Sequence, residues 1–127
     1  MEQELRTLMR STSVITAQVG QRIEWGTHPQ GTPLPAIVLT VASGFEGVHM
    51  NGTGPHEGRV QVDCYGMTYS AAKNAGKAVV AALNAYRGGG FLFISHASTR
   101  DSREGGTNEA ERPYRTGLDF NITWRPI

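Results

Sequence analysis

The sequence predicts an α+β fold, a mostly antiparallel sheet of about four to five strands with two helices packed on one face. Several segments alternate apolar and polar residues or are rich in β-branched residues, which is the pattern of strands in a half-covered sheet. Others repeat apolar residues at steps of three and four, the period of an amphipathic helix. A chain of 127 residues can build one hydrophobic core but not two. We therefore expect residues 1–127 to form a single domain.

The first predicted helix covers residues 2–10, where Leu5, Leu8 and Met9 recur at helical spacing. A short second helical turn follows, and Gly20 closes it. Both pieces carry apolar side chains on one side, which favours packing against a sheet.

Two predicted strands come next, with a loop between them. Residues 21–26 place Ile23 and Trp25 between charged or polar neighbours, which predicts a brief strand. Residues 27–35 contain three prolines and must form a loop. Residues 36–43, AIVLTVAS, are nearly continuous in apolar character and predict a central strand.

A long glycine-rich segment follows at residues 44–58. It contains five glycines and a proline, which predicts either a flexible loop or a hairpin whose arms extend beyond the sheet. Residues 59–65, RVQVDCY, then alternate cleanly and predict a strand. The alternation places Cys64, the only cysteine of the chain, on the apolar side of that strand.

The second long helix is expected from Ala71 to Tyr86, where apolar residues again recur at helical spacing. Thr68 or Ser70 can cap its start, and the three glycines at 88–90 end it.

Two further strands and a polar segment complete the chain. Residues 91–98, FLFISHAS, predict a strand. Residues 99–113 are polar, charged and without periodicity, which predicts a flexible loop that is disordered when the protein is alone. Residues 114–124, YRTGLDFNITW, show the clearest strand alternation in the sequence.

No catalytic, metal or cofactor site is predicted. Cys64 faces the core while Asp63 and Tyr65 face the other way, so these neighbours cannot converge on one substrate atom. The four histidines lack zinc-ligand spacing, and no nucleophile elbow or dinucleotide-binding glycine pattern occurs. Asp63 and Asp119 could in principle form a carboxylate dyad, but polar residues opposite a core stripe are more often a solvated or subunit-contacting face.

Charge and composition exclude other classes. The net charge of +1 argues against a dedicated nucleic-acid-binding protein, which would carry a basic face. No apolar run is long enough for a membrane span, and the N-terminus is no signal peptide. A single cysteine excludes an internal disulfide. We expect a soluble domain made in a reducing cytoplasm.

The sequence resembles the tail completion or tail terminator proteins of long-tailed phages and phage-like gene-transfer particles. The resemblance covers nearly the whole chain and is carried by VGQRIEWGTHPQGTPLPAIVLTVASG, RVQVDCYGMTYSAAKNAGKAVVAAL and YRTGLDFNITW. Its most typical points are Arg22-Ile23 before the proline loop, Leu34-Pro35-Ala36 at the start of a strand, and the final aromatic Trp124. These are structural positions rather than catalytic ones.

The resemblance implies a non-enzymatic virion protein in the tail or neck, assembled in the host cytoplasm. Such a protein would form a homohexameric ring on the end of the tail tube protein, stop tube growth, and offer a docking surface to the head connector or stopper protein. DNA would pass through the ring without specific binding, and neither a cofactor nor a membrane is implied.

Two sets of residues are candidates for contacts in such an assembly. Arginines and acidic residues interleave from residue 100 onward, which indicates either a solubilising loop or a loop that orders against a partner through ion pairs. For partner contact the candidates are Arg100, Arg103 and Arg112. For subunit contact through the polar sheet face they are Arg59, Asp63 and Asp119.

Other functions remain open at this stage. Within the same particle the chain could be a head-closure or neck protein, or a tail-tube subunit. From different classes, it could be a small hydrolase with a composite site, or a single-stranded nucleic-acid binder that stacks bases on Tyr65, Phe91 and Phe93.

Overall fold

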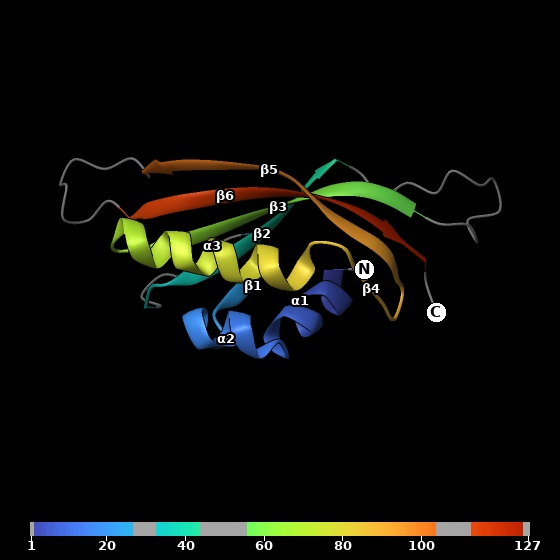
Figure 1. The fold of residues 1–127 in the computed structure, drawn as a ribbon, viewed down its shortest axis with the longest axis horizontal. Helices are drawn as coiled ribbons and strands as arrows, with labels where there is room; N and C mark the ends of the chain where they lie inside the picture. The colour runs from blue at the N-terminus through green and yellow to red at the C-terminus, as the bar shows by residue number, and fades with distance from the viewer. Residues whose placement is uncertain (1, 27–32, 44–55, 104–112, 126–127) are drawn as a thin grey trace.

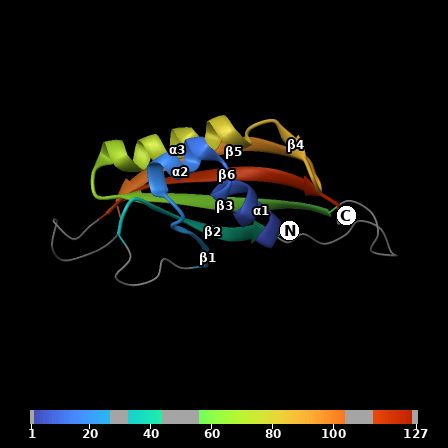
Figure 2. The same cartoon turned by 90° about the horizontal axis from the view of Figure 1, so that it is seen from below.

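The computed structural model describes residues 2–26, 33–43, 56–103 and 113–125. The elements run in the order α1 (Glu2–Arg10), α2 (Ser13–Val19), β1 (Ile23–Trp25), β2 (Ala36–Ser43), β3 (His56–Gly66), α3 (Tyr69–Leu83), β4 (Tyr86–Gly88), β5 (Phe91–Arg103) and β6 (Tyr114–Trp124). The strands form one sheet in the order β1-β2-β3-β6-β5-β4. The three helices of the described residues lie on the same side of this sheet, and within that part of the chain the other face has no helical layer (Figures 1 and 2).

The central pair of the sheet is β3 and β6, antiparallel from His56 opposite Trp124 to Gly66 opposite Tyr114. Strand β2 is antiparallel to β3, and β5 is antiparallel to β6 and to β4. The one parallel pairing among the described strands joins β1 to β2. The sheet is therefore mixed but mostly antiparallel, as expected.

The core lies between the sheet and the helices. On β3 the residues Val60, Val62 and Cys64 are fully buried, and on β6 Leu118 and Phe120 face the same way. Burial raises the pKa of the Cys64 thiol far above its ordinary range, with a smaller contribution from the neighbouring Asp63 carboxylate. The prediction that Cys64 is a core residue is confirmed.

The prediction of two helices is wrong in number. The short turn after α1 is a separate helix, α2, which ends where Gly20 adopts φ +62° and donates its N–H to Thr16 O at 2.8 Å. A positive φ is accessible to glycine at little cost, so Gly20 can turn the chain toward β1. The prediction that Gly20 closes this turn is confirmed.

The strand count also exceeds the prediction, because the helix expected to reach Tyr86 ends at Leu83. Ala85 has φ +66°, and its N–H donates to Ile94 O at 2.7 Å. The chain therefore leaves the helix and enters β4, which pairs with β5. A positive φ at alanine gives no signal in the sequence.

The prediction of a loop at 99–113 is wrong for residues 99–103, which continue β5 and pair with β6. Residues 56–58, assigned to the glycine-rich segment, belong to β3. Residues 44–55 and 104–112 lie outside the described residues, so the predictions of flexible loops there stay predictions. Within the residues that the structure describes, the sheet thus has six strands, where about four to five were expected.

Helix α3 packs closely against the sheet at Gly76. A Cβ atom at this position would lie 2.8 Å from Thr116 Cγ2 on β6, which is closer than carbon atoms pack. Thr116 is buried, and its hydroxyl donates to Asp101 Oδ1 at 3.0 Å. The glycine therefore sets the distance between α3 and the sheet.

We predict that Gly76→Ala destabilises the protein by about 1–3 kcal/mol, the usual cost of overpacking. In an exposed helix the same change would stabilise by about 1 kcal/mol. In a Thr116→Ser background the obstructing methyl is gone and the hydroxyl remains, so Gly76→Ala should become neutral or stabilising. Urea unfolding of the four proteins checks this. A Gly76→Ala protein more stable than the wild type would contradict it.

A second contact between α3 and the sheet joins Lys73 Nζ to Asp101 Oδ2 at 2.7 Å. The hydrogen bond with Asp101 raises the pKa of Lys73, and the hydrogen bond from Lys73 lowers the pKa of Asp101. A carboxyl group whose pKa is lowered on folding stabilises the folded state at pH values above its pKa in the unfolded chain, here 3.8. This stabilisation disappears as the pH falls through the pKa of the folded state.

We therefore predict that Asp101→Asn lowers stability at pH 7 and that this loss shrinks as the pH falls below 3.8. Unfolding by urea at a series of pH values from neutral to acid measures the difference. A loss that is constant across the series would show that the charge of Asp101 contributes nothing.

Candidate functional site

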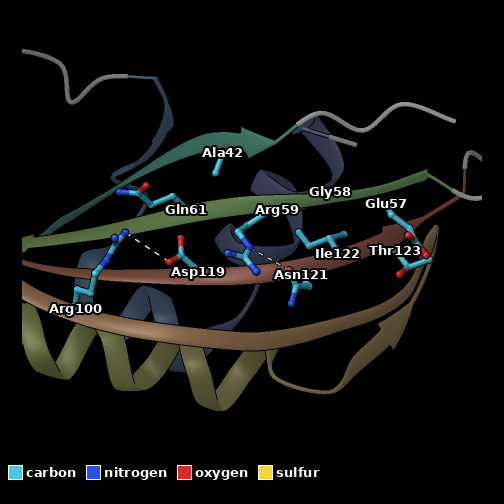
Figure 3. Close-up of a pocket in the computed structure, with 10 residues that line it drawn as sticks. All are labelled: Ala42, Glu57, Gly58, Arg59, Gln61, Arg100, Asp119, Asn121, Ile122 and Thr123. Atoms are coloured by element: carbon cyan, nitrogen blue, oxygen red, sulfur yellow. Dashed lines mark hydrogen bonds and ion pairs between the residues drawn. The ribbon is translucent and has the colours of Figure 1, made fainter. Parts of the chain in front are cut away.

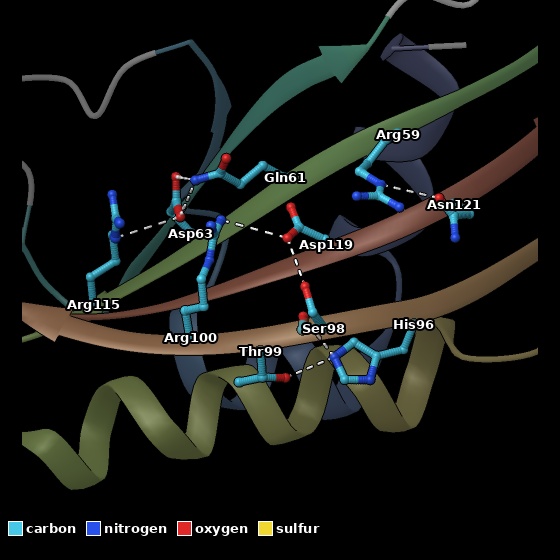
Figure 4. A network of polar contacts seen from close by, with 10 residues as sticks. All are labelled: Arg59, Gln61, Asp63, His96, Ser98, Thr99, Arg100, Arg115, Asp119 and Asn121. Atoms are coloured by element: carbon cyan, nitrogen blue, oxygen red, sulfur yellow. Dashed lines mark hydrogen bonds and ion pairs between the residues drawn. The ribbon is translucent and has the colours of Figure 1, made fainter.

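The polar face of the sheet is the candidate site. Because side chains alternate along a strand, the residues between the core positions of β3 and β6 point away from the helices. Figure 4 shows these side chains together with those of β5. They are Arg59, Gln61, Asp63, Ser98, Arg100, Arg115, Asp119 and Asn121.

Asp119 lies at the centre of this face and is only 8% exposed although none of the described helices covers it. Ser98 on β5 donates its hydroxyl to Asp119 Oδ2 at 2.8 Å. Arg100, two residues further along β5, places Nη2 3.5 Å from the same oxygen. The carboxylate is thus held by two groups of the neighbouring strand.

Asp63 on β3 is held in a similar way and is 5% exposed. Gln61 donates from Nε2 to both carboxylate oxygens, at 3.0 and 3.1 Å, and Arg115 Nε lies 3.8 Å from Oδ1. The residue opposite Asp63 on β6 is Gly117, where a Cβ would lie 3.1 Å from Asp63 Oδ1. A glycine at this position leaves room for the carboxylate.

The two carboxylates and two arginines form one cluster that balances its own charge. Asp63 lies opposite Gly117 and Asp119 opposite Gln61, so the carboxylates stand diagonally on adjacent strands. Each accepts hydrogen bonds from side chains of the sheet itself, which is how proteins keep buried carboxylates satisfied. The cluster therefore places Arg100 and Arg115 beside carboxylates on this face.

Beside this cluster the face is hollowed, with a volume of about 770 Å³ (Figure 3). Arg59 and Arg100 stand at the hollow with Glu57 and Asp119, so both signs of charge are present. Arg59 Nε donates to Asn121 Oδ1 at 3.2 Å. A mixed-charge hollow with fixed arginines is suited to ion pairs with another protein surface.

The structure brings together most of the residues that the sequence singled out. Arg59, Asp63 and Asp119 share one face, as the alternation predicts. Arg100, expected in a loop, lies on the same face within β5. Arg103 ends β5, and Arg112 lies outside the described residues.

Sequence reasoning missed Gln61, Ser98 and Arg115 as members of the cluster. Pairing the predicted strands 59–65 and 114–124 in antiparallel register would have placed Arg115 near Asp63. Ser98 had no such signal, because β5 carries a register shift between His96 and Ser98 that sequence alternation does not show.

The stacking hypothesis for single-stranded nucleic acid fails on geometry. Phe91 is 5% exposed and belongs to the core, where its ring meets Tyr86 edge-on at 6.3 Å. Phe91 lies opposite Trp124, whereas Tyr65 lies opposite Arg115, near the other end of β6. The three rings cannot present a common stacking surface.

Within residues 2–26, 33–43, 56–103 and 113–125, no three His, Cys, Asp or Glu residues come close enough together to hold a metal ion. In the same part of the chain, no helix has the length and apolar character needed to cross a membrane.

Comparison with known proteins gives the family. The family model described as tail completion protein gp17 matches residues 3–125. The chain belongs to this family. It is thus a structural protein of a phage-type virion, located in the tail or neck region, and it assembles with other virion proteins.

A solved structure shares the fold of this tail completion family member. It is a chain of the "Virion of native gene transfer agent (GTA) particle", with a TM-score of 0.62 and 20% sequence identity over 94% of this chain and 90% of that chain. No curated protein matches the sequence. The sequence resemblance to tail completion proteins is confirmed by the family match.

We predict that Asp119→Ala lowers the free energy of unfolding by about 1–3 kcal/mol, because it leaves the Ser98 hydroxyl without its acceptor and Arg100 without its carboxylate. Most of this loss should come from the hydrogen bond, since Arg100 is 61% exposed and exposed ion pairs contribute little. Asn121→Ala, on the same strand and face but exposed, is the matched control and should change stability by about 0.5 kcal/mol or less. Equal effects in urea unfolding would show that the cluster is not stabilising.

Proposed function

We propose that this protein forms a closed homohexameric ring that caps the tail tube and joins the tail to the head connector. The observation that supports the proposal most strongly is the match to tail completion proteins over residues 3–125. The helix-free sheet face, with its ordered arginines and carboxylates, supplies a surface suited to protein contacts.

A cyclic ring needs two different complementary patches on each subunit. For subunit contact we propose Arg59, Asp63 and Asp119, with Arg59 at the surface and the two carboxylates acting by holding their arginines in place. For contact with the tail tube protein or the head connector we propose Arg100, Arg103 and Arg112. Arg100 has the exposed guanidinium that such contacts require.

The charge balance suits a ring through which DNA passes. Tight binding of DNA comes from the release of counterions by clustered cations. Here Arg100 and Arg115 on the open face each stand beside a carboxylate, and the net charge of the chain is +1. We therefore propose passage of DNA without specific binding, a structural role without catalysis or a cofactor, and no association with a membrane.

Neighbouring roles in the same particle are the alternatives. A tail-tube subunit adds copies without limit, whereas a terminator stops at a closed ring. A head-closure protein would act on filled heads and not on the length of tails.

Removing the gene from the producing phage or particle separates these roles. For a terminator we expect tails of excessive and irregular length and heads that remain unjoined, with normal particles restored by the wild-type gene. Electron microscopy of the lysate gives the readout. Absence of all tubes would instead identify a tube subunit, and tails of normal length beside leaking heads would identify a head-closure protein.

A further inference from the structure

Strand β5 has a long edge that no described strand pairs with. Its outer neighbour β4 reaches it only at Tyr86 opposite Ile94 and Gly88 opposite Phe91. From Ala97 to Ser102 the side chains of β5 are exposed. An open edge of this length invites pairing with another strand.

The backbone groups of this edge point outward at known positions. Ile94 O accepts from Ala85 N, and His96 N donates to Asn84 Oδ1 at 3.0 Å, so both point away from β6. His96 lies opposite Phe120, and Thr99 opposite Leu118, two residues further along β6. Because backbone direction alternates along a strand, the N–H and C=O of Thr99 also point outward.

An apolar groove of about 430 Å³ runs beside this edge, between α3 and the sheet. Val80 and Ala81 of α3 line one wall, and Thr99 of β5 and Leu118 of β6 line the other. Figure 4 shows His96 and Thr99 on the side of β5 toward α3. A strand edge next to an apolar groove is the arrangement in which an added strand gains both hydrogen bonds and a side-chain pocket.

The other end of the sheet has a second edge, on β2, that the described strands leave partly unpaired. Strand β1 covers β2 only along Ile37, Val38 and Leu39. Ile37 N donates to Arg22 O, and Leu39 O accepts from Gly26 N. The odd-numbered residues of β2 therefore point their N–H and C=O groups away from β3. Val41 is the next such residue. Val41 lies opposite Val60, which places its half-buried side chain on the helix side of the sheet.

We propose that the edge of β2 at Val41 in one copy of this chain pairs with the edge of β5 at Thr99 in the next copy, and that the Val41 side chain enters the groove beside α3. The inference rests on the proposed ring and adds a backbone contact between strand edges to the polar-face contact proposed above. Successive antiparallel pairings make β2 and β5 antiparallel within one copy. If the strands run along the ring axis, a copy rotated about that axis keeps this sense, so β2 of one copy and β5 of the next are antiparallel.

The two edges match in further respects. Val41 and Thr99 both point their backbone groups outward. Two such residues, placed opposite each other in an antiparallel pair, exchange both N–H···O bonds. Their side chains then lie on the same face, here the helix side, which is where the groove lies. Because the two edges differ, the contact is head-to-tail and repeats from copy to copy until the ring closes.

Proline substitution tests the pairing, because proline removes the N–H and is tolerated at edge positions where that N–H points outward. Thr99→Pro blocks the β5 edge and Val41→Pro blocks the β2 edge. Thr99→Val keeps the N–H and is the matched control, and Val41→Ala keeps the N–H but removes the groove side chain. Light scattering over a concentration series gives the mass of each, and circular dichroism checks folding.

We expect rings for the wild type and for Thr99→Val, and folded monomers for each proline variant. Val41→Ala should associate about ten-fold more weakly, consistent with the loss of a buried branched side chain. An equimolar mixture of Thr99→Pro and Val41→Pro retains one intact edge of each kind and should stop at a dimer.

Rings formed by either proline variant would overturn the pairing. A wild-type protein that stays monomeric throughout the concentration series would also overturn it, and so would a mixture of the two proline variants that stays monomeric. The gene-removal experiment is independent of these masses. If gene removal gives over-long tails and the proline variants still form rings, the proposed capping function is supported and only this contact is rejected.

Discussion

The pairing of β3 with β6 is the constraint on which the rest of the structure depends. Both strands are 11 residues long and pair along their whole length. Their alternation sends Val60, Val62 and Cys64 to one face together with Leu118 and Phe120. A slip of one residue would exchange the two faces, so the register fixes both the core and the polar surface at once. The helices need only to cover the apolar side.

The polar side must then satisfy its own groups without a covering layer. Asp63 and Asp119 are nearly buried by neighbouring side chains alone, and Gly117 leaves the space that one of them needs. Removing one partner of such a cluster leaves a poorly solvated charge, which costs more than the intact pair contributes. The two carboxylates are consequently ordered by Ser98 and Gln61 before any partner arrives, with Arg100 and Arg115 beside them. Ordering that is already present in the free subunit lowers the cost of association.

The sequence predicted those parts of the fold where local pattern and final environment agree. The alternation of residues 59–65 and 114–124 predicted the core side of Cys64 and the shared face of Arg59, Asp63 and Asp119, because these strands have one covered face. Residues 99–103 have polar side chains on both faces, since Asp101 meets Lys73 on the helix side while Arg100 meets Asp119 on the other. Only pairing with β6, distant in the sequence, makes this segment a strand. Likewise, the return of the chain through Ala85 into β4 depends on a hydrogen bond to Ile94 rather than on residue type.

In this architecture the edges of the sheet and the ends of its strands are separate surfaces, so contacts between subunits and contacts with other proteins can use different parts of the molecule. If subunits join through the edges of β2 and β5, the contacts lie in the plane of the sheet, and the two ends of the strands stay available. Each end carries exposed apolar side chains: Met67 and Tyr69 near the Gly66–Tyr114 end of the β3–β6 ladder, with the Tyr69 ring edge-on to Tyr114, and Leu92 and Phe93 near its other end. A tube subunit must fit its own copies at both ends, so its two ends must be complementary to each other. A terminator instead meets the tube on one side and a different protein on the other, so its two ends need not be complementary to each other, and exposed apolar side chains at each end supply surface for a partner.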